Sequence, residues 1–214
     1  MKHLVITGAS GGLGKAIVES FAAASWEIAA PTHGELDVAD AAAIESYFHS
    51  RPVDLLICAA GIIRDAALSH LDEFAWDQVL AVNYQGAAAC AAAVLPKMIE
   101  RRSGHVIFIS SHSAFHPPRG QAAYATAKAA LLGLTASLAR RNGHHGVRVN
   151  AILPGFLETG MTESISEKRR AEILNGHILG RFNTPTIVAR FIRLLAEELT
   201  HTSGQVFQLD SRIS

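Results

Sequence analysis

The amino-acid sequence predicts an α/β fold in which one parallel sheet is covered by helices on both faces. Short apolar runs alternate with longer amphipathic segments along the 214 residues, as in doubly wound sheets. Hydrophobic residues make up 49% of the chain, enough for one sizeable core, and no linker, repeat or low-complexity stretch divides it. The first apolar run leads directly into a glycine-rich turn and a helical run. We therefore expect a single domain over residues 1–214.

Six strands and six helices follow from these patterns, taken in chain order. The strands are short apolar runs, expected at Lys2–Thr7, Glu27–Ala30, Asp54–Ala59, His105–Ser110, Val147–Ile152 and Gln205–Leu209. The helices are amphipathic segments, expected at Gly12–Ala24, Asp40–His49, Asp72–Asn83, Gln85–Arg101, Gln121–Asn142 and Pro185–Glu198. Ligands of such sheets bind beyond the carboxyl ends of the strands. Four segments that follow strands should therefore share one crevice, namely Gly8–Gly14, Ala59–Gly61, Ser110–Ser113 and Pro154–Thr159.

The segment after the second strand is too short for the usual layout. Pro31–Glu35 leads at once to Leu36, Asp37 and Val38, whereas a parallel neighbour normally requires a crossover of a dozen or more residues. We predict that no helix follows the second strand here and that the third strand is short or vestigial. The sheet should then have six strands, or six and a stub at its edge.

The turn that follows the first strand has the composition of a pyrophosphate-binding site. Strand Lys2–Thr7 is followed by Thr7–Gly14, and a helical run begins there. Gly8 would permit the tight turn, Gly12 would let the backbone approach phosphate, and Gly14 would let the helix pack on the strand. A merely structural turn is the alternative. The position at the first strand of an alternating chain favours a dinucleotide.

A tyrosine and a lysine spaced as neighbours on a helix suggest acid–base chemistry. Tyr124 and Lys128 lie four residues apart in the helical run beginning at Gln121, so the phenol and the ammonium would share a face. A close cation favours the phenolate, and lowering the tyrosine pKa by about 3 units takes about 4 kcal/mol, which one desolvated lysine plus a cationic cofactor ring could supply. A surface tyrosine near a solvated lysine is the alternative.

Charge, cysteines and histidines exclude several function classes. Lys plus Arg equals Asp plus Glu at 19 each, and the pI is about 7.2, so nothing indicates binding to nucleic acid or to an anionic membrane. Cys58 and Cys90 lie in apolar runs and are interpreted as buried thiols. His112 and His116 are four apart, but Pro117-Pro118 disfavours a helix that would align them as metal ligands. We expect no metal site.

The N-terminal run is expected to be a folded strand and not a signal peptide. No apolar stretch was expected to reach the 18 or more residues of a membrane span. A soluble, cytoplasmic protein is the expectation.

Taken together, the motifs resemble the short-chain dehydrogenase/reductase family. Thr7–Gly14, Asn83, Ser111, Tyr124-x-x-x-Lys128 and Pro154–Thr159 occur in the family's order and spacing over nearly the whole chain. The resemblance is closest to the 3-oxoacyl-(acyl-carrier-protein) reductases, whose segments resemble Pro154–Thr159 and Leu179–Phe182 here. It implies a Rossmann-type sheet and an NAD(P)-dependent oxidoreductase acting on a carbonyl or secondary alcohol, with a 3-oxoacyl thioester as the expected substrate. A reductase of another ketone, polyketide or sugar is the alternative, and a non-catalytic cofactor-binding regulator is less favoured.

The resemblance also implies the catalytic residues. Tyr124 would donate the proton to the substrate oxygen, and Ser111 would hydrogen-bond the same oxygen. Lys128 would lower the pKa of Tyr124 and hold the nicotinamide ribose. Asn83 would bind a water that refills the proton relay behind Lys128.

Cofactor contacts follow from the same resemblance. Their expected set comprises Gly8, Ser10, Gly11, Gly12, Leu13, Gly14, Thr32, His33, Asp37, Val38, Ala60, Gly61, Tyr124, Lys128, Pro154, Gly155, Leu157 and Thr159. The family's Asn-Asn-Ala-Gly is Cys58–Gly61 here, which loses polar side chains but keeps a backbone path. NADP(H) is favoured over NAD(H) because no acid stands at residues 31–33, where one would repel a 2′-phosphate. Thr32 or His33 would meet the phosphate, although Glu35 nearby opposes this.

Residues 156–185 correspond to the family's variable substrate lid. Met161, Ile165, Ile173 and Leu174 are expected to turn inward at helical spacing. The family implies a small carbonyl substrate, a thioester-linked acyl carrier as a candidate partner, and a homodimer or homotetramer.

Two departures leave partners open. Arg102 matches one carrier-docking position of the family, whereas His145 replaces the arginine of a second. Leu209–Arg212 replaces the usual Asp-Gly-Gly ending, which leaves the C-terminal subunit contact open.

Overall fold

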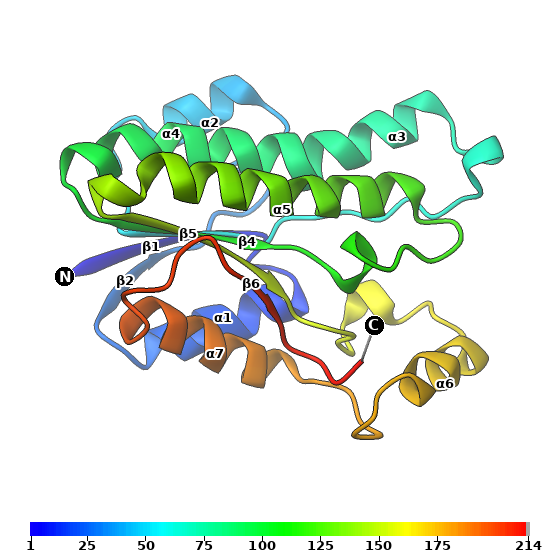
Figure 1. The fold of residues 1–214 in the computed structure, drawn as a ribbon. Helices are drawn as coiled ribbons and strands as arrows, with labels where there is room; N and C mark the ends of the chain where they lie inside the picture. Colours follow the sequence, from blue (N-terminus) through cyan, green and yellow to red (C-terminus); the bar gives the residue numbers. More distant parts are fainter. Residues whose placement is uncertain (213–214) are drawn as a thin grey trace.

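The sheet has six parallel strands, and Figure 1 shows it between two layers of helices. The computed structural model describes residues 1–212. The strand order is β2-β1-β3-β4-β5-β6. The bounds are β1 Lys2–Thr7, β2 Trp26–Ala29, β3 Leu55–Cys58, β4 Gly104–Ile109, β5 Val147–Leu153 and β6 Val206–Gln208. The predicted Rossmann-type α/β fold is confirmed, since the order reverses between β1 and β3.

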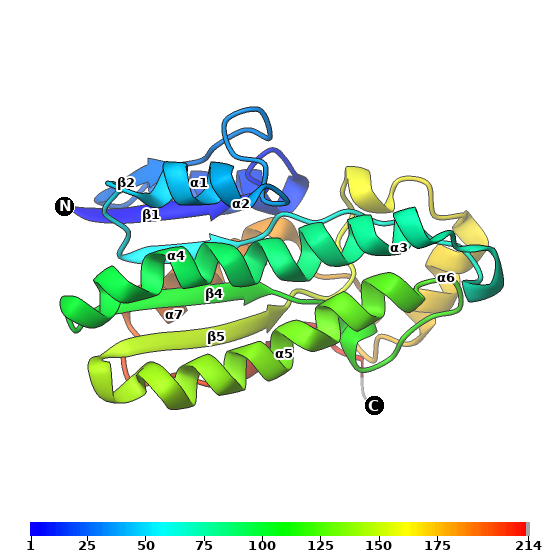
Figure 2. The ribbon, with the colours of Figure 1, turned by 90° about the horizontal axis from the view of Figure 1, so that it is seen from above.

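Helices cover both faces of the sheet (Figures 1 and 2). One layer holds α2 Ala41–Phe48, α3 Glu73–Leu80, α4 Gly86–Glu100 and α5 Ala122–Asn142, and the other holds α1 Gly12–Ala22 and α7 Pro185–Glu197. Helix α6, Glu167–Asn175, lies outside both layers, beyond the carboxyl ends of the strands. The predicted bounds differ from these mostly by one or two residues.

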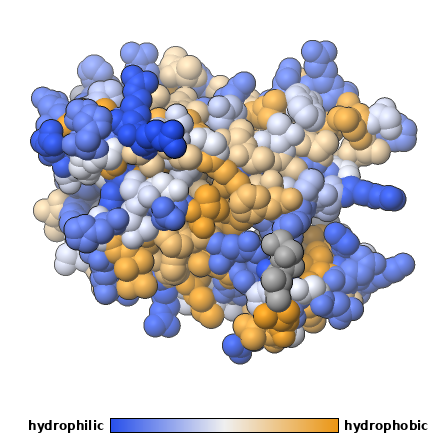
Figure 3. Space-filling view, in the orientation of Figure 1, coloured by the Kyte–Doolittle hydropathy of each residue, from blue (hydrophilic) through white to orange (hydrophobic). Residues whose placement is uncertain are grey.

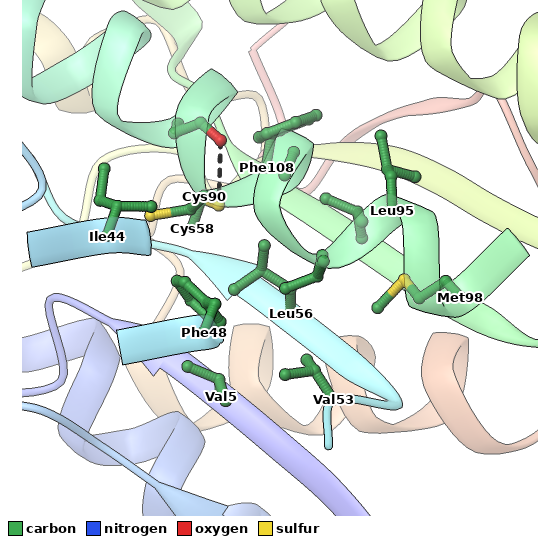
Figure 4. Close-up of a cluster of buried hydrophobic side chains, with 14 of the residues drawn as sticks. Val5, Ile44, Phe48, Val53, Leu56, Cys58, Cys90, Leu95, Met98 and Phe108 are labelled. Atoms are coloured by element: carbon green, nitrogen blue, oxygen red, sulfur yellow. Dashed lines mark hydrogen bonds between the residues drawn. The ribbon is translucent and has the colours of Figure 1, made fainter. Parts of the chain in front are cut away.

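The two faces of the sheet form two cores because successive strand side chains point to opposite sides. On β1, Val5 packs toward α2 and α4 whereas Leu4 and Ile6 pack toward α1 and α7. Figure 4 shows the first core, where Cys58 and Cys90 lie among buried apolar side chains. Both thiols are free and buried, as predicted, and burial is the main reason that the pKa of each is raised.

The missing third strand is the departure that the sequence predicted. No helix or strand lies between Ala30 and Ala39, and the chain passes through a turn at residues 33–35 to α2. Asp40 caps α2 by accepting from the N–H groups of Ala42 and Ala43. Val38 is held against the start of α4, where a β-carbon on Gly86 would lie 2.4 Å from the Val38 oxygen. The edge of the sheet is therefore β2.

Helix α3 continues into α4 through a π-helical turn at Ala81–Gln85. The resulting helix, Glu73–Glu100, and the helix Ala122–His145 are long and apolar enough to cross a membrane, contrary to the expectation that no stretch would reach that length. Both lie along the sheet, with 44% and 33% of the most apolar windows buried. Their length and composition are those of core helices in this fold.

The surface mixes polar and apolar side chains. On the face drawn in Figure 3, apolar groups gather over α7 and β6. The exposed large apolar residues of α7 and β6 are Ile187, Leu194 and Val206.

Candidate active site

The loops at the carboxyl ends of the strands meet, as the sheet order requires. A β-carbon on Gly8 would lie 2.5 Å from the Ala60 nitrogen, and one on Gly12 would lie 2.6 Å from Cγ2 of Thr159. Thr7 also accepts, through Oγ1, a hydrogen bond from the Ala60 N–H at 3.3 Å. The glycine turn, the segment after β3 and the segment after β5 thus meet at the carboxyl end of the sheet.

The start of α1 is built to receive an anion. Gly11 precedes the helix without a side-chain cap, and the first turn holds no acidic residue. The first N–H groups of the helix and its dipole therefore point into the crevice. Gly8 has φ +74, and a β-carbon on Gly14 would lie 2.3 Å from the Gly8 oxygen, so both positions need glycine. The cradle fits the pyrophosphate of a dinucleotide.

The other two predicted residues of this turn differ in exposure. Ser10 is exposed at the turn, so its side chain is accessible to a ligand. Leu13 is half-buried and packs on the core beneath α1.

Ser111, Tyr124 and Lys128 come together where β4 ends and α5 begins. Ser111 stands two residues after the end of β4 and caps a short 3₁₀ turn, His112–Ala114. Tyr124 lies half-buried in the first turn of α5, close enough to Ser111 for the serine side chain to lower the pKa of the phenol. Lys128 is buried one turn later, and its Nζ lies 5.6 Å from the centre of the Tyr124 ring. Lys128 Nζ also donates to the Ile109 oxygen at 2.9 Å, which fixes the ammonium beside the end of β4.

The predicted lowering of the Tyr124 pKa by Lys128 does not appear in this structure. The pKa of Tyr124 is raised, chiefly by burial, and the hydrogen bond with Ser111 only partly opposes this. Burial also lowers the pKa of Lys128 to about 8. The physical reason is that burial penalises both charged forms, while Lys128 directs its Nζ toward the Ile109 carbonyl. At neutral pH Tyr124 therefore holds its proton.

Asn83 lies in the π-helical turn, a feature frequent at functional sites. Its Nδ2 donates to the oxygens of Ile62 and Val79, both at 2.9 Å. Its Oδ1 is buried and has no hydrogen-bond partner among the described residues. A β-carbon on Gly61 would lie 2.6 Å from this Oδ1 and 3.6 Å from Lys128 Nζ. An unsatisfied acceptor thus lies close to Gly61 and to the lysine, and a donor such as a water or a ribose hydroxyl would satisfy it.

The segment after β5 closes the opposite side of the crevice. Gly155 has φ +85, and a β-carbon there would lie 2.6 Å from Cβ of Asp210. Pro154 is buried, and its oxygen accepts from Asn183 Nδ2 at 3.4 Å. The Leu157 side chain is 6% exposed in the core, so only its backbone can meet a ligand. Thr159 is half-buried next to Gly12.

At the adenosine end, the expected phosphate-binding residues are already engaged. Thr32 donates through its backbone N–H and its hydroxyl to Glu35 Oε2, at 2.8 and 2.9 Å. Hydrogen bonds from Thr32 lower the pKa of Glu35, the backbone bond most. His33 and Asp37 face each other at 3.8 Å.

Comparison with known proteins decides the family. A family model described as short chain dehydrogenase matches residues 32–170. The chain belongs to the short-chain dehydrogenase/reductase family. A 3-oxoacyl-(acyl-carrier-protein) reductase of Thermotoga maritima is 40% identical over 159 residues, which cover 74% of this chain and 65% of that enzyme. One from Escherichia coli is 32% identical over 233 residues, covering 98% and 96%.

A solved structure agrees with this short-chain dehydrogenase/reductase assignment. It is described as an NAD(P)-dependent gluconate 5-dehydrogenase from Beutenbergia cavernae with NADP bound at low occupancy. It superposes with a TM-score of 0.92 at 31% identity and covers 98% of this chain and 95% of that one. The protein is therefore an NAD(P)-dependent oxidoreductase with the fold of that family.

The lid of this short-chain dehydrogenase differs from the expectation at one residue. Met161 is 49% exposed and so turns outward, whereas Ile165, Ile173 and Leu174 are half-buried as an inward stripe requires. The face of α6 that carries Ile173 and Leu174 is not fully buried because the helix lies outside the two main layers.

The C-terminal segment carries an ion pair that the sequence did not reveal. The Asp210 carboxylate is fully buried against Gly155 and accepts from Nε of Arg212 at 2.7 Å. His177 Nε2, also buried, lies 3.8 Å from the same carboxylate, and residues 177 and 212 form an antiparallel bridge. The signal available in the sequence was that Leu209–Arg212 replaces the family's usual Asp-Gly-Gly ending. In this short-chain dehydrogenase, Arg212 ties the C-terminal segment to the lid.

Proposed function

We propose that this protein reduces the 3-oxo group of an acyl thioester to a hydroxyl, with NADPH as the reductant. The observation that carries the proposal is the joining of Ser111, Tyr124 and Lys128 to an anion cradle at the start of α1. Support for the substrate comes from the full-length similarity to a 3-oxoacyl-(acyl-carrier-protein) reductase.

Each side chain has a role that its geometry supports. A bound nicotinamide supplies the hydride that reduces the carbonyl carbon. Tyr124 donates its phenolic proton to the carbonyl oxygen, and the Ser111 hydroxyl donates a hydrogen bond to the same oxygen, stabilising the charge that develops there. Lys128 holds the ribose. Asn83 Oδ1 accepts from a water that returns the proton to Tyr124 through Lys128.

The raised pKa of Tyr124 suits the reductive direction. A proton donor must be protonated before the reaction, and burial keeps the phenol neutral at physiological pH. Oxidation of an alcohol requires the phenolate instead. Without bound cofactor, Tyr124 is therefore already in the proton-donating form that reduction requires.

Gly8–Gly14 and Pro154–Thr159, with Ala60 and Gly61, form the cofactor side of the crevice in this proposal. Residues 156–185 are the substrate lid of a single catalytic domain, residues 1–214. We further propose a cytoplasmic homodimer or homotetramer.

NADPH is the proposed form of the cofactor because residues 30–33 offer no acid to repel a 2′-phosphate. The neighbouring structure binds NADP. A 2′-phosphate would take the two Thr32 donors that Glu35 now occupies. Dissociation constants for NADPH and NADH test this, and tighter binding of NADH would reverse the choice.

Glu35→Gln offers a sharper test of the cofactor site. Removing the carboxylate charge should tighten NADPH binding about tenfold while changing NADH binding little, because only NADPH places a phosphate there. The measurement is the dissociation constant of each cofactor by fluorescence titration. Glu45→Gln on the exposed side of α2 serves as the control. Equal changes for both cofactors would place the phosphate elsewhere.

A substrate panel tests the reaction itself. Specific activities with NADPH are compared for 3-oxoacyl thioesters of rising chain length, simple ketones and keto sugar acids. The last class is included because the gluconate 5-dehydrogenase is similar over 98% of this chain. A preference for thioesters by kcat/KM supports the proposal. A preference for keto acids would replace it, and tight cofactor binding without turnover would indicate a regulator.

An acyl carrier protein is the proposed thioester donor. Arg102 donates through Nη2 to the His144 oxygen at 2.8 Å, and the ring centroids of His144 and His145 lie 3.8 Å apart with the rings tilted by 42°. The closeness of Arg102 and His144, near the start of β4, supports the proposal that the carrier docks there. The contribution of the carrier protein is measured by comparing kcat/KM for a carrier-linked substrate and a coenzyme A-linked substrate with the same acyl chain.

A further inference from the structure

A chain of hydrogen bonds links three separate segments and ends on Ser111. Gln121, immediately before α5, donates from Nε2 to Asp65 Oδ2 at 2.8 Å. The Ser113 hydroxyl donates to Oε1 of Gln121 at 3.0 Å. The backbone N–H of Ser113 then donates to Ser111 Oγ at 3.1 Å. We call Asp65, Gln121 and Ser113 the positioning chain.

The chemistry of the groups gives the chain a direction. A carboxylate only accepts hydrogen bonds, so Asp65 fixes the amide NH₂ of Gln121 toward itself and the amide oxygen toward Ser113. The oxygen in turn holds Ser113 and its backbone N–H under Ser111. A second bond braces the same two segments, since the Ala66 N–H donates to the Gly120 oxygen at 2.9 Å.

The consequence falls on the Ser111 hydroxyl. With one lone pair of Ser111 Oγ occupied by the Ser113 N–H, the rotation of the hydroxyl is restricted and its hydrogen can point at the substrate oxygen. Preorganised donors stabilise developing charge best when nothing has to reorient during the reaction. None of the three residues belongs to the Ser-Tyr-Lys-Asn set, and the chain spans 56 residues of sequence.

We propose that Gln121, oriented by Asp65, is a positioning residue that acts through Ser113 to aim the Ser111 hydroxyl at the substrate carbonyl. The inference rests on the carbonyl reduction proposed above. It assigns a function to three polar side chains that the family motifs do not include.

The charge of Asp65 adds a second effect on the same site. Burial is the main reason that the pKa of Tyr124 is raised, and Asp65 raises it further while the Ser111 hydrogen bond lowers it. Lys128 faces the ring from α5. His112, next to Ser111, is neutral at pH 7 because burial, followed by the charge of Arg212, lowers its pKa to about 4. Asp65 thus helps keep Tyr124 in its proton-donating form.

Gln121→Met tests the positioning role, because the side chain keeps its length and loses both hydrogen bonds. We expect kcat to fall about 10-fold to 100-fold, less than the loss of an oxyanion donor itself. The dissociation constant for NADPH and the melting temperature should stay unchanged. Gln205→Met, at an exposed glutamine before β6, is the matched control and should keep full activity.

A double variant that exchanges the carboxylate and the amide between positions 65 and 121 tests whether activity can be restored. Gln121→Glu alone sets two carboxylates against each other and should lose at least as much activity as Gln121→Met. Combined with Asp65→Asn, the new asparagine amide can donate to the new carboxylate, and kcat should return to within about threefold of wild type. Activity of Gln121→Met within twofold of wild type, or a double variant no better than Gln121→Glu, would overturn the proposal.

The readouts separate this inference from the proposed function. Ratios of variant to wild-type kcat are taken on whichever carbonyl the wild type reduces, so a failure on 3-oxoacyl thioesters alone refutes the substrate and leaves the ratios meaningful. A second readout does not depend on turnover. The phenolate absorbance of each protein is titrated with and without the additional substitution Tyr124→Phe, and the difference between the two curves is the titration of Tyr124. Asp65→Asn should shift this titration to lower pH, and Asp77→Asn on α3 should not. An unchanged titration in Asp65→Asn would refute the charge effect of Asp65.

Discussion

At the scale of single residues, the buried ammonium of Lys128 lowers the free energy of unfolding, although the proposed reaction needs this side chain. The ammonium is 4% exposed, and burial lowers its pKa from 10.5 to about 8. This shift corresponds to about 3 kcal/mol of destabilisation at neutral pH. Its hydrogen bond to the Ile109 oxygen returns about 1 kcal/mol of that.

Lys128→Met should therefore stabilise the cofactor-free protein by about 1–2 kcal/mol at pH 7 while abolishing turnover. The stability gain must shrink as pH rises from about 8 to 10.5, because the buried lysine of the wild type loses its charge there before that of the unfolded chain. Denaturant unfolding at pH 7 and at pH 10 measures both effects. A variant less stable than wild type at pH 7 would show that burying the Lys128 ammonium does not destabilise the folded protein.

Residue roles were partly readable from the sequence. The spacing of Tyr124 and Lys128 predicted their shared helix face, which the structure confirms. It did not predict that burial would raise the Tyr124 pKa, because desolvation depends on what packs around the ring. Gln121 and Asp65 were also missed, since nothing local marks two residues that meet across 56 positions.

At the scale of elements, the β1–α1 turn depends on glycine at defined places. Gly14→Ala should destabilise the protein by several kcal/mol, since its β-carbon would lie 2.3 Å from the Gly8 oxygen, a backbone atom. Gly143→Ala is the matched control, because Gly143 has α-helical dihedrals and nothing within 4 Å.

The Gly143 substitution should stabilise the protein by about 0.5–1 kcal/mol by restricting the unfolded chain. Thermal unfolding compares the two variants, together with NADPH binding. Similar melting temperatures for both would refute the close packing of α1 on the turn.

Elements were predictable where apolar periodicity was strong, as in β1, β4 and α5. The π-helical turn around Asn83 was not, because it goes with a tertiary contact, the hydrogen bond from Asn83 to the Ile62 oxygen. The absent third strand was predictable for the opposite reason. A chain of seven residues from Pro31 to Asp37 leaves no length for a crossover, whatever its composition.

At the scale of the whole molecule, buried histidines make stability depend on pH. Burial, with the charge of Arg148, lowers the pKa of His105 well below its usual value, and His105 Nε2 lies 3.0 Å from Nδ2 of Asn150. The pKa of His112 is lowered to about 4. Below pH 6.5 the unfolded chain takes up protons that the folded protein resists, so stability is lost as pH falls.

Each such histidine should reduce the free energy of unfolding by up to about 1.4 kcal/mol per pH unit below 6.5. Denaturant unfolding at pH 7.5, 6 and 5 measures the decline. His105→Gln, which keeps an acceptor for Asn150, should flatten it. If the free energy of unfolding of this variant falls with pH as steeply as that of the wild type, groups other than His105 cause the acid sensitivity.

The strand order, the glycine turn and the family comparison all indicate the same kind of protein. The sheet order brings the ends of β1, β3, β4 and β5 together, the glycine turn leaves an uncapped helix N-terminus there, and the family comparison identifies the result as an NAD(P)-dependent oxidoreductase. We propose that residues 156–185 select the substrate, and the sequence predicted only in part which of them are exposed and which half-buried.

The most direct test is the rate of NADPH oxidation with a 3-oxoacyl thioester, measured side by side for the wild type and Tyr124→Phe. We predict steady turnover by the wild type and a loss of about 1,000-fold or more in the variant, because the phenolic proton has no substitute at the carbonyl oxygen. NADPH should bind both proteins with dissociation constants within about threefold. Turnover by Tyr124→Phe at the wild-type rate would contradict the account.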